Sequence, residues 1–234
     1  ISNTIKLQGA PIAITKTSGI LNFNNMDADF NLQSNLNNSQ IKTNGKIKNN
    51  ICNAQIISHK FNIGDAVKTL PISSKLPYKN DLSTINTSFV GKYNGDIQNI
   101  DYNNIYLKGN IYSNRGAKSA IIVDNSKFEL KNSSFKLNNL KGTFKNSPYY
   151  ISLNIANMFD KNRLVNSNCQ IKSLDLNLIN DNAIQYILPP KIAKNLKDIE
   201  PLNGKIDISA KIHNNNLNTY TILDNVSLLY KPKH

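Results

Sequence analysis

The stretch KFELKNSSFKLN, residues 127–138, decides the fold. Apolar Phe128, Leu130, Phe135 and Leu137 alternate with charged or polar residues, and a short Asn/Ser segment separates the two alternating runs. Strict period-two alternation puts one face of a strand against an apolar environment and leaves the other face in water. The stretch therefore predicts two antiparallel strands joined by a turn.

The same alternation recurs in both directions from this hairpin, in IKL (5–7), PIAIT (11–15), DFNLQ (29–33), YISLNIA (150–156), LDLNL (174–178) and KIDISAKI (205–212). Asn and Gly favour turns because both accept positive φ, and clusters rich in them separate the runs: KTNGKIKNN (42–50), KYNGD (92–96), SNRG (113–116) and HNNN (213–216). The sequence thus predicts a mostly-β chain built as a succession of antiparallel hairpins.

Two segments interrupt the alternation. GDAVKTL, residues 64–70, is expected to form one or two helical turns with Asp65 near the positive end of the helix dipole. A helical insertion is expected at 181–200, with helix near 183–198 broken by the pair Pro189–Pro190. In its second part, one apolar face is predicted to dock on the sheet, formed by Ile192, Ala193, Leu196 and Ile199.

No linker rich in Pro or Ser marks a sharp domain boundary. A soft boundary is expected within residues 71–85, where two prolines accompany weak alternation. It divides the chain into an N-terminal β segment, 1–80, and a second β segment, 81–234, that contains the helical insertion. Because the sequence starts at Ile1 without an initiator methionine, we expect the chain to be part of a longer protein.

The chain carries 28 Lys and Arg against 15 Asp and Glu, a formal net charge of +13. Such a balance is typical of proteins that bind nucleic acid or anionic lipid. Only Arg115 and Arg163 are arginines, however, and Asn, Lys and Ile are all abundant, as AT-rich codons produce. Arginine forks and stacked aromatics that read nucleic acid are missing, so no nucleic-acid partner is expected. No apolar run approaches the roughly 20 residues that span a bilayer.

Catalytic and metal-binding patterns are missing as well. His59, His213 and His234 stand apart from one another and from any acidic cluster, so neither a metal nor a cofactor is expected. Asp27 and Asp29 share one side of a predicted strand and are the best acid–base candidates, with a solvated sheet face as the favoured alternative. The sequence therefore predicts no enzymatic activity.

The two cysteines, Cys52 and Cys169, lie far apart in the sequence and belong to no CxxC motif. A disulfide between them is possible in an oxidising compartment. Small buried apolar side chains are the favoured interpretation of both residues. The spacing alone leaves the choice open.

The segment YILPPKIAKNLKDIEPLNGKIDISAKI, residues 186–212, resembles the AsmA-like superfamily of bacterial envelope proteins, which includes YhdP and TamB. The resemblance rests on Pro189 and Pro190 followed by a short amphipathic helix, and on Leu202-x-Gly204-x-Ile206-x-Ile208 starting a new strand. The repeats in 18–35 and 107–144 are similar to the strand-turn-strand units of that group. The resemblance covers most of the chain as a pattern and is specific only in 186–212.

The resemblance implies a curved antiparallel sheet, shaped like a taco, with an apolar groove inside. It also implies a segment of an inner-membrane-anchored periplasmic protein that binds phospholipid acyl chains and transports lipid to the outer membrane, with outer membrane biogenesis as its role. The expected partners are phospholipids and, through other parts of the parent protein, both membranes. The alternative is a structural or adhesive envelope β-protein with no ligand; a glycan-binding module or hydrolase is disfavoured because tryptophan is absent.

If the groove exists, its expected lining is apolar and comes from the alternating runs. The predicted lipid-binding residues are Phe128, Leu130, Phe135, Leu137, Ile151, Leu153, Ile155, Leu174, Leu176, Leu178, Ile206, Ile208 and Ile212. For each residue the alternative is the buried core of a β-sandwich or barrel. Nearby lysines could meet lipid phosphates at a rim or simply be solvated: Lys127, Lys131, Lys172 and Lys211.

Overall fold

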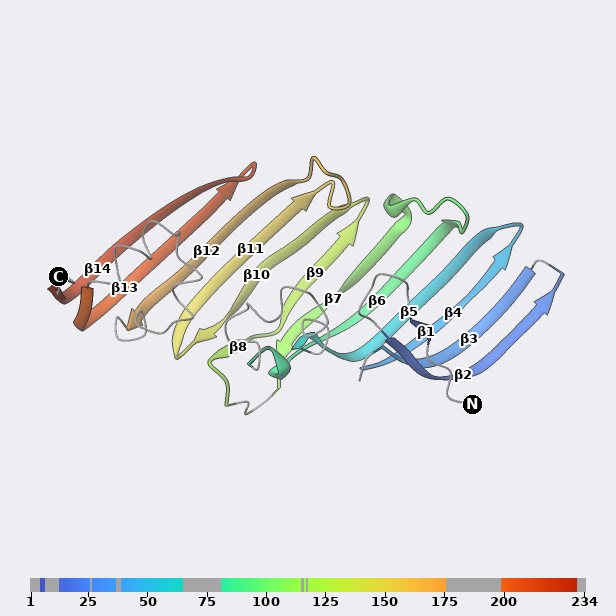
Figure 1. The fold of residues 1–234 in the computed structure, drawn as a ribbon, viewed down its shortest axis with the longest axis horizontal. Helices are drawn as coiled ribbons and strands as arrows, with labels where there is room; N and C mark the ends of the chain where they lie inside the picture. Colours follow the sequence, from blue (N-terminus) through green and yellow to red (C-terminus); the bar gives the residue numbers. More distant parts are fainter. Residues whose placement is uncertain are drawn as a thin grey trace.

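The computed structural model describes residues 5–6, 13–25, 27–36, 39–64, 81–114, 116, 118–175 and 199–230. Fourteen strands form one open antiparallel sheet in which spatial order follows chain order from β1 to β14 (Figure 1). The one exception is β8, which pairs with β10 beside the end of β9. The predicted mostly-β chain of antiparallel hairpins is therefore confirmed.

The strands are β1 (Ile5–Lys6), β2 (Ala13–Asn24), β3 (Asp27–Leu36), β4 (Ser39–Lys48), β5 (Ile51–Asn62), β6 (Ile85–Asp96), β7 (Ile105–Ser113), β8 (Ile121–Val123), β9 (Ser126–Lys131), β10 (Ser134–Phe144), β11 (Ser147–Ala156), β12 (Leu164–Asp175), β13 (Ile199–His213) and β14 (Asn216–Tyr230). Within the described ranges, a short 3-10 turn precedes each of two strands, η2 (Asp81–Thr84) before β6 and η3 (Tyr102–Asn104) before β7.

Asparagine makes the tight hairpin turns. Asn49–Asn50, Asn132–Ser133, Lys145–Asn146 and Asn214–Asn215 each connect two strands, and both residues of every pair have positive φ. That geometry matches the right-handed twist of the flanking strands, and asparagine adopts it at low cost. The prediction that the Asn clusters at 42–50 and 213–216 contain turns is confirmed at Asn49–Asn50 and at Asn214–Asn215.

Two Asn-Gly pairs predicted as turns lie inside strands instead. Gly45 is in the middle of β4 and Gly95 is near the end of β6. A Cβ atom added to Gly45 would lie 2.6 Å from Cζ of Phe30 on the neighbouring strand. The aromatic ring therefore covers the glycine, an arrangement that stabilises glycine within a sheet. The sequence pattern missed this because Asn-Gly is also the commonest hairpin signal.

The pairing register sorts the side chains onto two different faces. One row of paired positions crosses nine strands and carries apolar or small residues: Leu32, Thr43, Ile56, Gly91, Leu107, Leu130, Phe135, Ile155 and Val165. The adjacent row on the opposite side is largely polar or charged: Gln33, Lys42, Ile57, Val90, Lys108, Glu129, Lys136, Asn154 and Asn166. We call the first side the inner face and the second the outer face.

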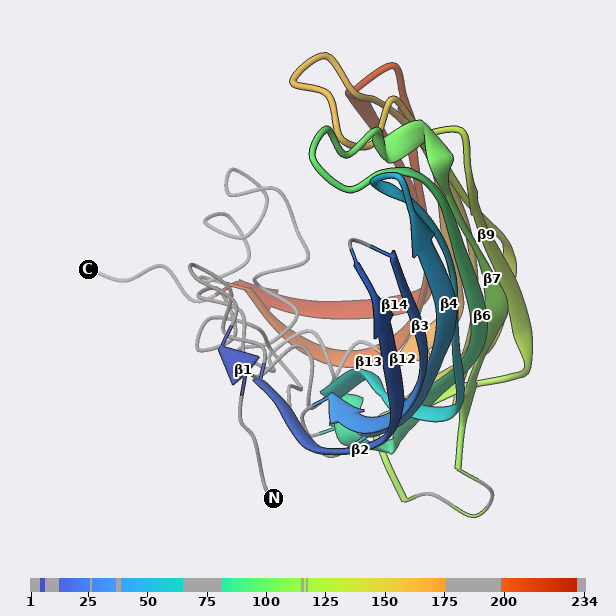
Figure 2. The same ribbon diagram turned by 90° about the vertical axis from the view of Figure 1, so that its right-hand side faces the viewer.

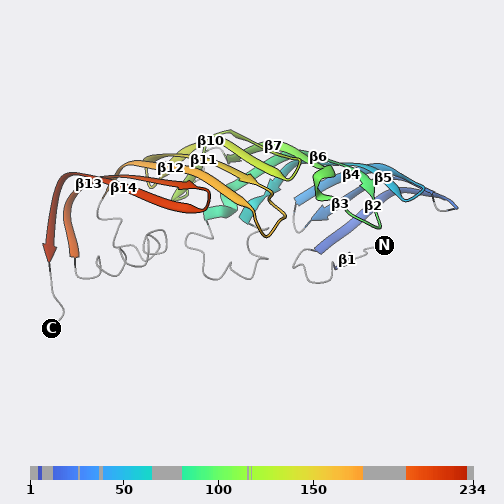
Figure 3. The ribbon, with the colours of Figure 1, turned by 90° about the horizontal axis from the view of Figure 1, so that it is seen from above.

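Beta-bulges bend the sheet into a trough. The register shifts between Ser58 and Phe61 in β5 and between Leu137 and Leu140 in β10. Further shifts occur in β2, β12 and β13. An extra residue on one strand bends that strand and increases its twist. Viewed along its long axis the sheet has a C-shaped section (Figure 2), and from above it forms a single arched layer (Figure 3).

One margin of the inner face is closed by the chain itself. The closed margin is a buried apolar cluster that includes Leu82 of η2 among its packing partners, and its members are Ile85, Val123, Leu140, Phe144, Tyr149, Leu174 and Ile206. Leu174, only 1% exposed, pairs directly with Ile206 across β12 and β13. Because η2 lies on the concave side of the sheet (Figure 2), the inner face lines the trough.

Hydrogen bonds attach the connections to this margin. The Asp81 carboxylate accepts bonds from the Ser119 hydroxyl at 2.9 Å and from the Ala120 backbone N–H at 2.7 Å. The fully buried amide of Asn86 donates to the Asn114 side-chain oxygen at 3.0 Å and to the Thr84 carbonyl at 3.2 Å. These bonds hold η2 and the segment before β8 against the base of β6 and β7.

The two helix predictions fall mostly outside the described residues. Ile63 and Gly64 are helical, while the rest of 64–70 and all of 183–198 lie outside them. Ile199 and Pro201 belong to β13, so the prediction that Ile199 completes an apolar helical face is wrong. Pairing with Tyr230 of β14 extends the strand three residues upstream of the expected start at Leu202.

Candidate hydrocarbon-binding face

The register places the predicted lining residues on one face. Leu130 pairs with Phe135 and Phe128 pairs with Leu137 across β9 and β10. The same inner face continues over β11 to β13 through Ile151, Leu153, Ile155, Leu174, Ile206, Ile208 and Ile212. Leu176 and Leu178 lie outside the described residues. The eleven described residues therefore share a surface, and lipid binding by that surface remains a prediction.

Burial divides this set into two groups. Leu174 and Ile206 belong to the closed margin and are buried. Leu130 is buried as well, and the other eight residues are half-buried. In a closed sandwich the corresponding side chains would be covered by a second sheet. Within the described part of the chain, all strands belong to the one sheet.

Sequence reasoning did not include the N-terminal half of the same face. The inner face also carries half-buried apolar residues on β3 to β7: Phe30, Leu32, Ile47, Ile56, Phe61, Phe89, Tyr93, Ile105 and Leu107. Only the run around Phe30 alternates clearly in the sequence. Elsewhere Gly45, Gly91 and Gly109 occupy inner positions and break the apolar pattern, so the register was needed to find the rest.

A small apolar hollow lies on this inner face over β4 to β7. Its volume is about 330 Å³, and it is lined on the inner side by Thr43, Ala54, Ile56, Gly91, Tyr93, Ile105 and Leu107. Ile100, 57% exposed, closes one side of the hollow from the connection between β6 and β7. The inner lining of the hollow offers mainly hydrocarbon surface, which suits an apolar group better than a polar one.

Gly91 lies in this hollow between two apolar side chains. A Cβ atom on Gly91 would lie 2.6 Å from Cγ2 of Ile56 and 3.3 Å from Cδ1 of Leu107. Gly109 is covered in a similar way by the ring of Phe128, whose Cζ lies 2.8 Å from the corresponding Cβ position. At both positions a side chain of a neighbouring strand therefore occupies the space that a Cβ atom would need.

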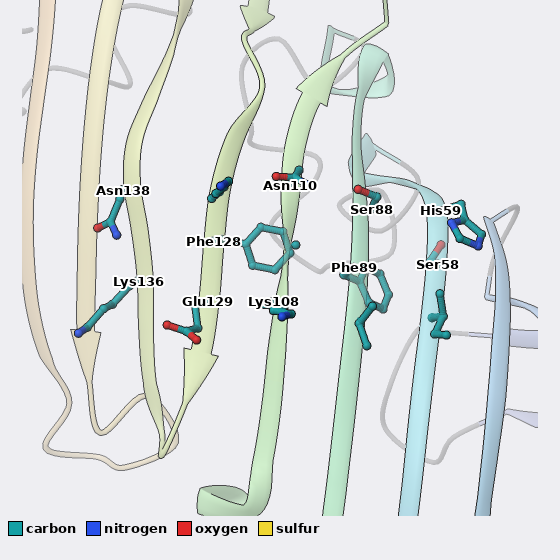
Figure 4. A pocket seen from close by; sticks show the side chains of 14 residues that line it. Ser58, His59, Ser88, Phe89, Lys108, Asn110, Phe128, Glu129, Lys136 and Asn138 are labelled. Carbon is teal, nitrogen blue, oxygen red and sulfur yellow. The ribbon is translucent and has the colours of Figure 1, made fainter.

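The outer face has a groove of different chemistry, about 610 Å³ in volume (Figure 4). Lys108, Glu129 and Lys136 lie at one level on three neighbouring strands, with the carboxylate directly opposite both lysines. The next level carries Ser88, Asn110, Lys127 and Asn138. The groove runs across the strands at the level of the bulges in β5 and β10, and its ammonium and amide groups face solvent.

In the described part of the chain, the acidic and histidine side chains do not gather into a cluster. Asp29 forms an exposed ion pair with Lys46 at 3.6 Å, and Asp27 accepts a bond from the Asn49 backbone N–H at 3.2 Å. His59 and His213 are exposed on separate strands, and His234 lies outside the described residues. Among the described residues, no group of three or more His, Cys, Asp or Glu side chains could hold a metal ion.

Both cysteines are free thiols on the inner face. Cys52 pairs with Ile47 and Gly95, and Cys169 pairs with Ile151 and Ala210. Burial raises the pKa of both thiols, which disfavours the reactive thiolate. The two residues therefore act as small apolar side chains in this structure.

Neither family models, curated proteins nor solved structures provide a match to this chain. No helix in the described ranges has the length and apolar character needed to cross a membrane.

Proposed function

We propose that the inner face binds phospholipid acyl chains and that the chain is a segment of an inner-membrane-anchored periplasmic protein carrying lipid toward the outer membrane. The observation behind the proposal is the apolar row that crosses nine strands of a single-layered sheet. Most of its side chains are half-buried, so they keep apolar surface for a guest. The resemblance to AsmA-like proteins supports the same function.

Surface area supplies the binding energy in this proposal. Each acyl methylene removed from water contributes about 0.8 kcal/mol, so a long chain binds without a polar anchor. The inner row repeats similar residues from strand to strand, and a bound acyl chain can therefore move along the trough with little change in contact. Such a surface has no need of a catalytic constellation, and the described inner face consists mainly of hydrocarbon side chains.

Adjacent residues of β5 provide a matched test. Ile56 points to the inner face and lines the hollow, whereas Ile57 belongs to the outer face, and both are half-buried. A charge on the inner face would be buried by a bound acyl chain at high cost. We expect Ile56→Glu to reduce bound phospholipid about tenfold, equivalent to about 1.4 kcal/mol, while Ile57→Glu keeps most of it.

Native mass spectrometry of the purified chain, and of delipidated chain incubated with phospholipid vesicles, measures the bound lipid. Circular dichroism of both variants checks that they fold. A parent chain that neither retains lipid nor takes it up from vesicles would contradict the proposal and favour a structural envelope protein without a ligand. Equal lipid content in two folded variants would remove the inner face as the binding surface.

A further inference from the structure

The sheet has two long edges whose backbone groups lack a strand partner within the described residues. β14 pairs with β13 on one side only, and β2 pairs with β1 only at Ala13 and Ile14. A free edge presents a row of N–H and C=O groups ready to pair with another strand. Soluble proteins usually block such edges with lysine, proline, a short strand or a covering segment.

The β14 edge has few of those protections, whereas β2 carries Lys16 and a bulge between Thr15 and Ser18 near its start. β14 is 15 residues long, contains neither Lys nor Pro, and has Asp224 as its one charged residue. The bulge at Asn225 interrupts only its second half. Among the residues whose burial is described, fourteen large hydrophobic side chains are exposed, and seven of them lie on the two edge strands: Ile20, Leu21, Phe23, Leu217, Tyr220, Ile222 and Leu223. Phe23 is 72% exposed and Tyr220 is 67% exposed.

We propose that the β14 edge of one copy pairs with the β2 edge of a second copy, so that the trough continues from copy to copy. Strand direction favours this pairing. The path from β2 to β14 holds twelve strands that alternate in direction, so β14 and the β2 of a following copy run antiparallel. The same placement keeps the inner faces of the two copies on one side, which makes the apolar surface continuous.

The side chains of the two edges are complementary in this pairing. Leu217 and Phe23 are inner-face residues beside the turns at the same end of the sheet. Placing them opposite each other also puts Tyr220 opposite Ile20 on the outer face. Apolar cross-strand pairs of this kind stabilise a sheet. Both edges therefore bury their most exposed residues against each other.

Variants with one added cysteine test the pairing directly. Tyr220→Cys and Ile20→Cys place thiols on opposite edges, within disulfide reach of each other in the proposed pair. Under mild oxidation we expect a cross-linked dimer in the mixture of the two variants and none in either variant alone. The parent chain measures the background from Cys52 and Cys169. Cross-linking of Tyr220→Cys alone would instead show two β14 edges pairing with each other, and would overturn the head-to-tail arrangement.

The oligomer distribution provides a second measurement. A head-to-tail contact leaves one free edge at each end of the assembly, so further copies can add. Light scattering should therefore detect a series of multiples of 26.2 kDa that depends on concentration. A chain that stays monomeric at every concentration, with no cross-link above the parent background, contradicts the proposal. Neither readout depends on bound lipid, so a monomer that still takes up phospholipid would contradict the assembly alone.

A matched pair of lysine variants checks which face is shared. Thr221 and Asn218 are exposed residues of β14 on the inner and outer faces respectively. Thr221→Lys would place a charge on the continuous apolar surface and should weaken association about tenfold, whereas Asn218→Lys should change it far less. Equal weakening by both variants would contradict a shared inner face.

Discussion

The closed and open margins of the inner face are built from the same alternating strands but differ in what packs on them. At the closed margin, η2 and β8 bring Leu82 and Val123 into a cluster in which Leu174 and Ile206 are buried. At the open margin, around the hairpin turns at 49–50, 132–133 and 214–215, residues such as Ile56, Leu107 and Ile155 stay half-buried. The closed margin therefore contributes most of the buried core, and the open margin keeps apolar surface accessible.

Truncating one leucine in each margin should give the largest contrast. Leu174→Ala leaves a cavity in a buried cluster and should cost about 2–5 kcal/mol of unfolding free energy. Leu107→Ala removes a half-buried side chain that lines an existing hollow and should cost about 1 kcal/mol. Urea unfolding of the two variants measures both values. Equal losses would mean that the open margin is also packed as a core.

Adding a methyl group to a glycine in each margin should give the next contrast. A Cβ on Gly142 would clash with the backbone carbonyl of Ile122, which cannot move without displacing β8. A Cβ on Gly91 would meet only the side chains of Ile56 and Leu107.

We therefore expect Gly142→Ala to cost about 1–3 kcal/mol and Gly91→Ala clearly less. Thermal unfolding measures the difference between the variants. Gly91→Ala should also lower lipid uptake, because the added methyl group fills part of the hollow. Undiminished uptake by this variant would show that the hollow is not a preferred position for an acyl chain.

Alkaline pH should lower the stability of the closed margin through Tyr149, and this is the smallest of the expected effects. Burial, assisted by the charge of Asp124, raises the pKa of Tyr149 well above its ordinary value of 10.0. Its hydroxyl donates to the Ile122 carbonyl at 3.0 Å. Because the pKa of Tyr149 is higher in the folded than in the unfolded state, the neutral hydroxyl contributes its full stabilisation below about pH 10. That stabilisation is lost as the pH rises toward the folded-state pKa.

Tyr149→Phe should be less stable than the parent by about 0.5–1.5 kcal/mol at neutral pH. The difference should shrink above pH 10, as followed by unfolding at several pH values. Tyr150→Phe is the control, because Tyr150 is exposed on the outer face of the same strand. A constant difference up to pH 11 would contradict this role of the buried hydroxyl.

Alternation in the sequence was sufficient to predict the fold and one half of the inner face. Runs such as KFELK and YISLNIA keep strict period two, and each lies on a strand with its apolar residues on the inner face. The asparagine pairs also identified several turns. Local pattern sufficed there because neighbouring strands are joined by short turns.

Features that depend on neighbouring strands could not be predicted. Gly45 belongs to a strand because Phe30 of the next strand covers it, and Ile199 belongs to β13 because Tyr230 pairs with it. The bulges that bend the sheet could not be located from the pattern of apolar residues. Bulge residues such as Asn139 and Ser173 are marked by a positive φ, which the sequence does not show. The predicted boundary near residue 80 remains a prediction, although β5 and β6 pair directly across that region.

The agreement between chain order and spatial order has a consequence for how such a molecule folds and changes size. Nearly every strand contacts only the strands next to it in the sequence, so ordering can spread from strand to strand, with a long connection to close only between β5 and β6 and between β12 and β13. Stability then grows as a sum of nearest-neighbour terms, as it does in repeat proteins. Duplication or loss of one hairpin would lengthen or shorten the molecule by two strands. The remaining strands would keep their twist and the assignment of their residues to the inner and outer faces.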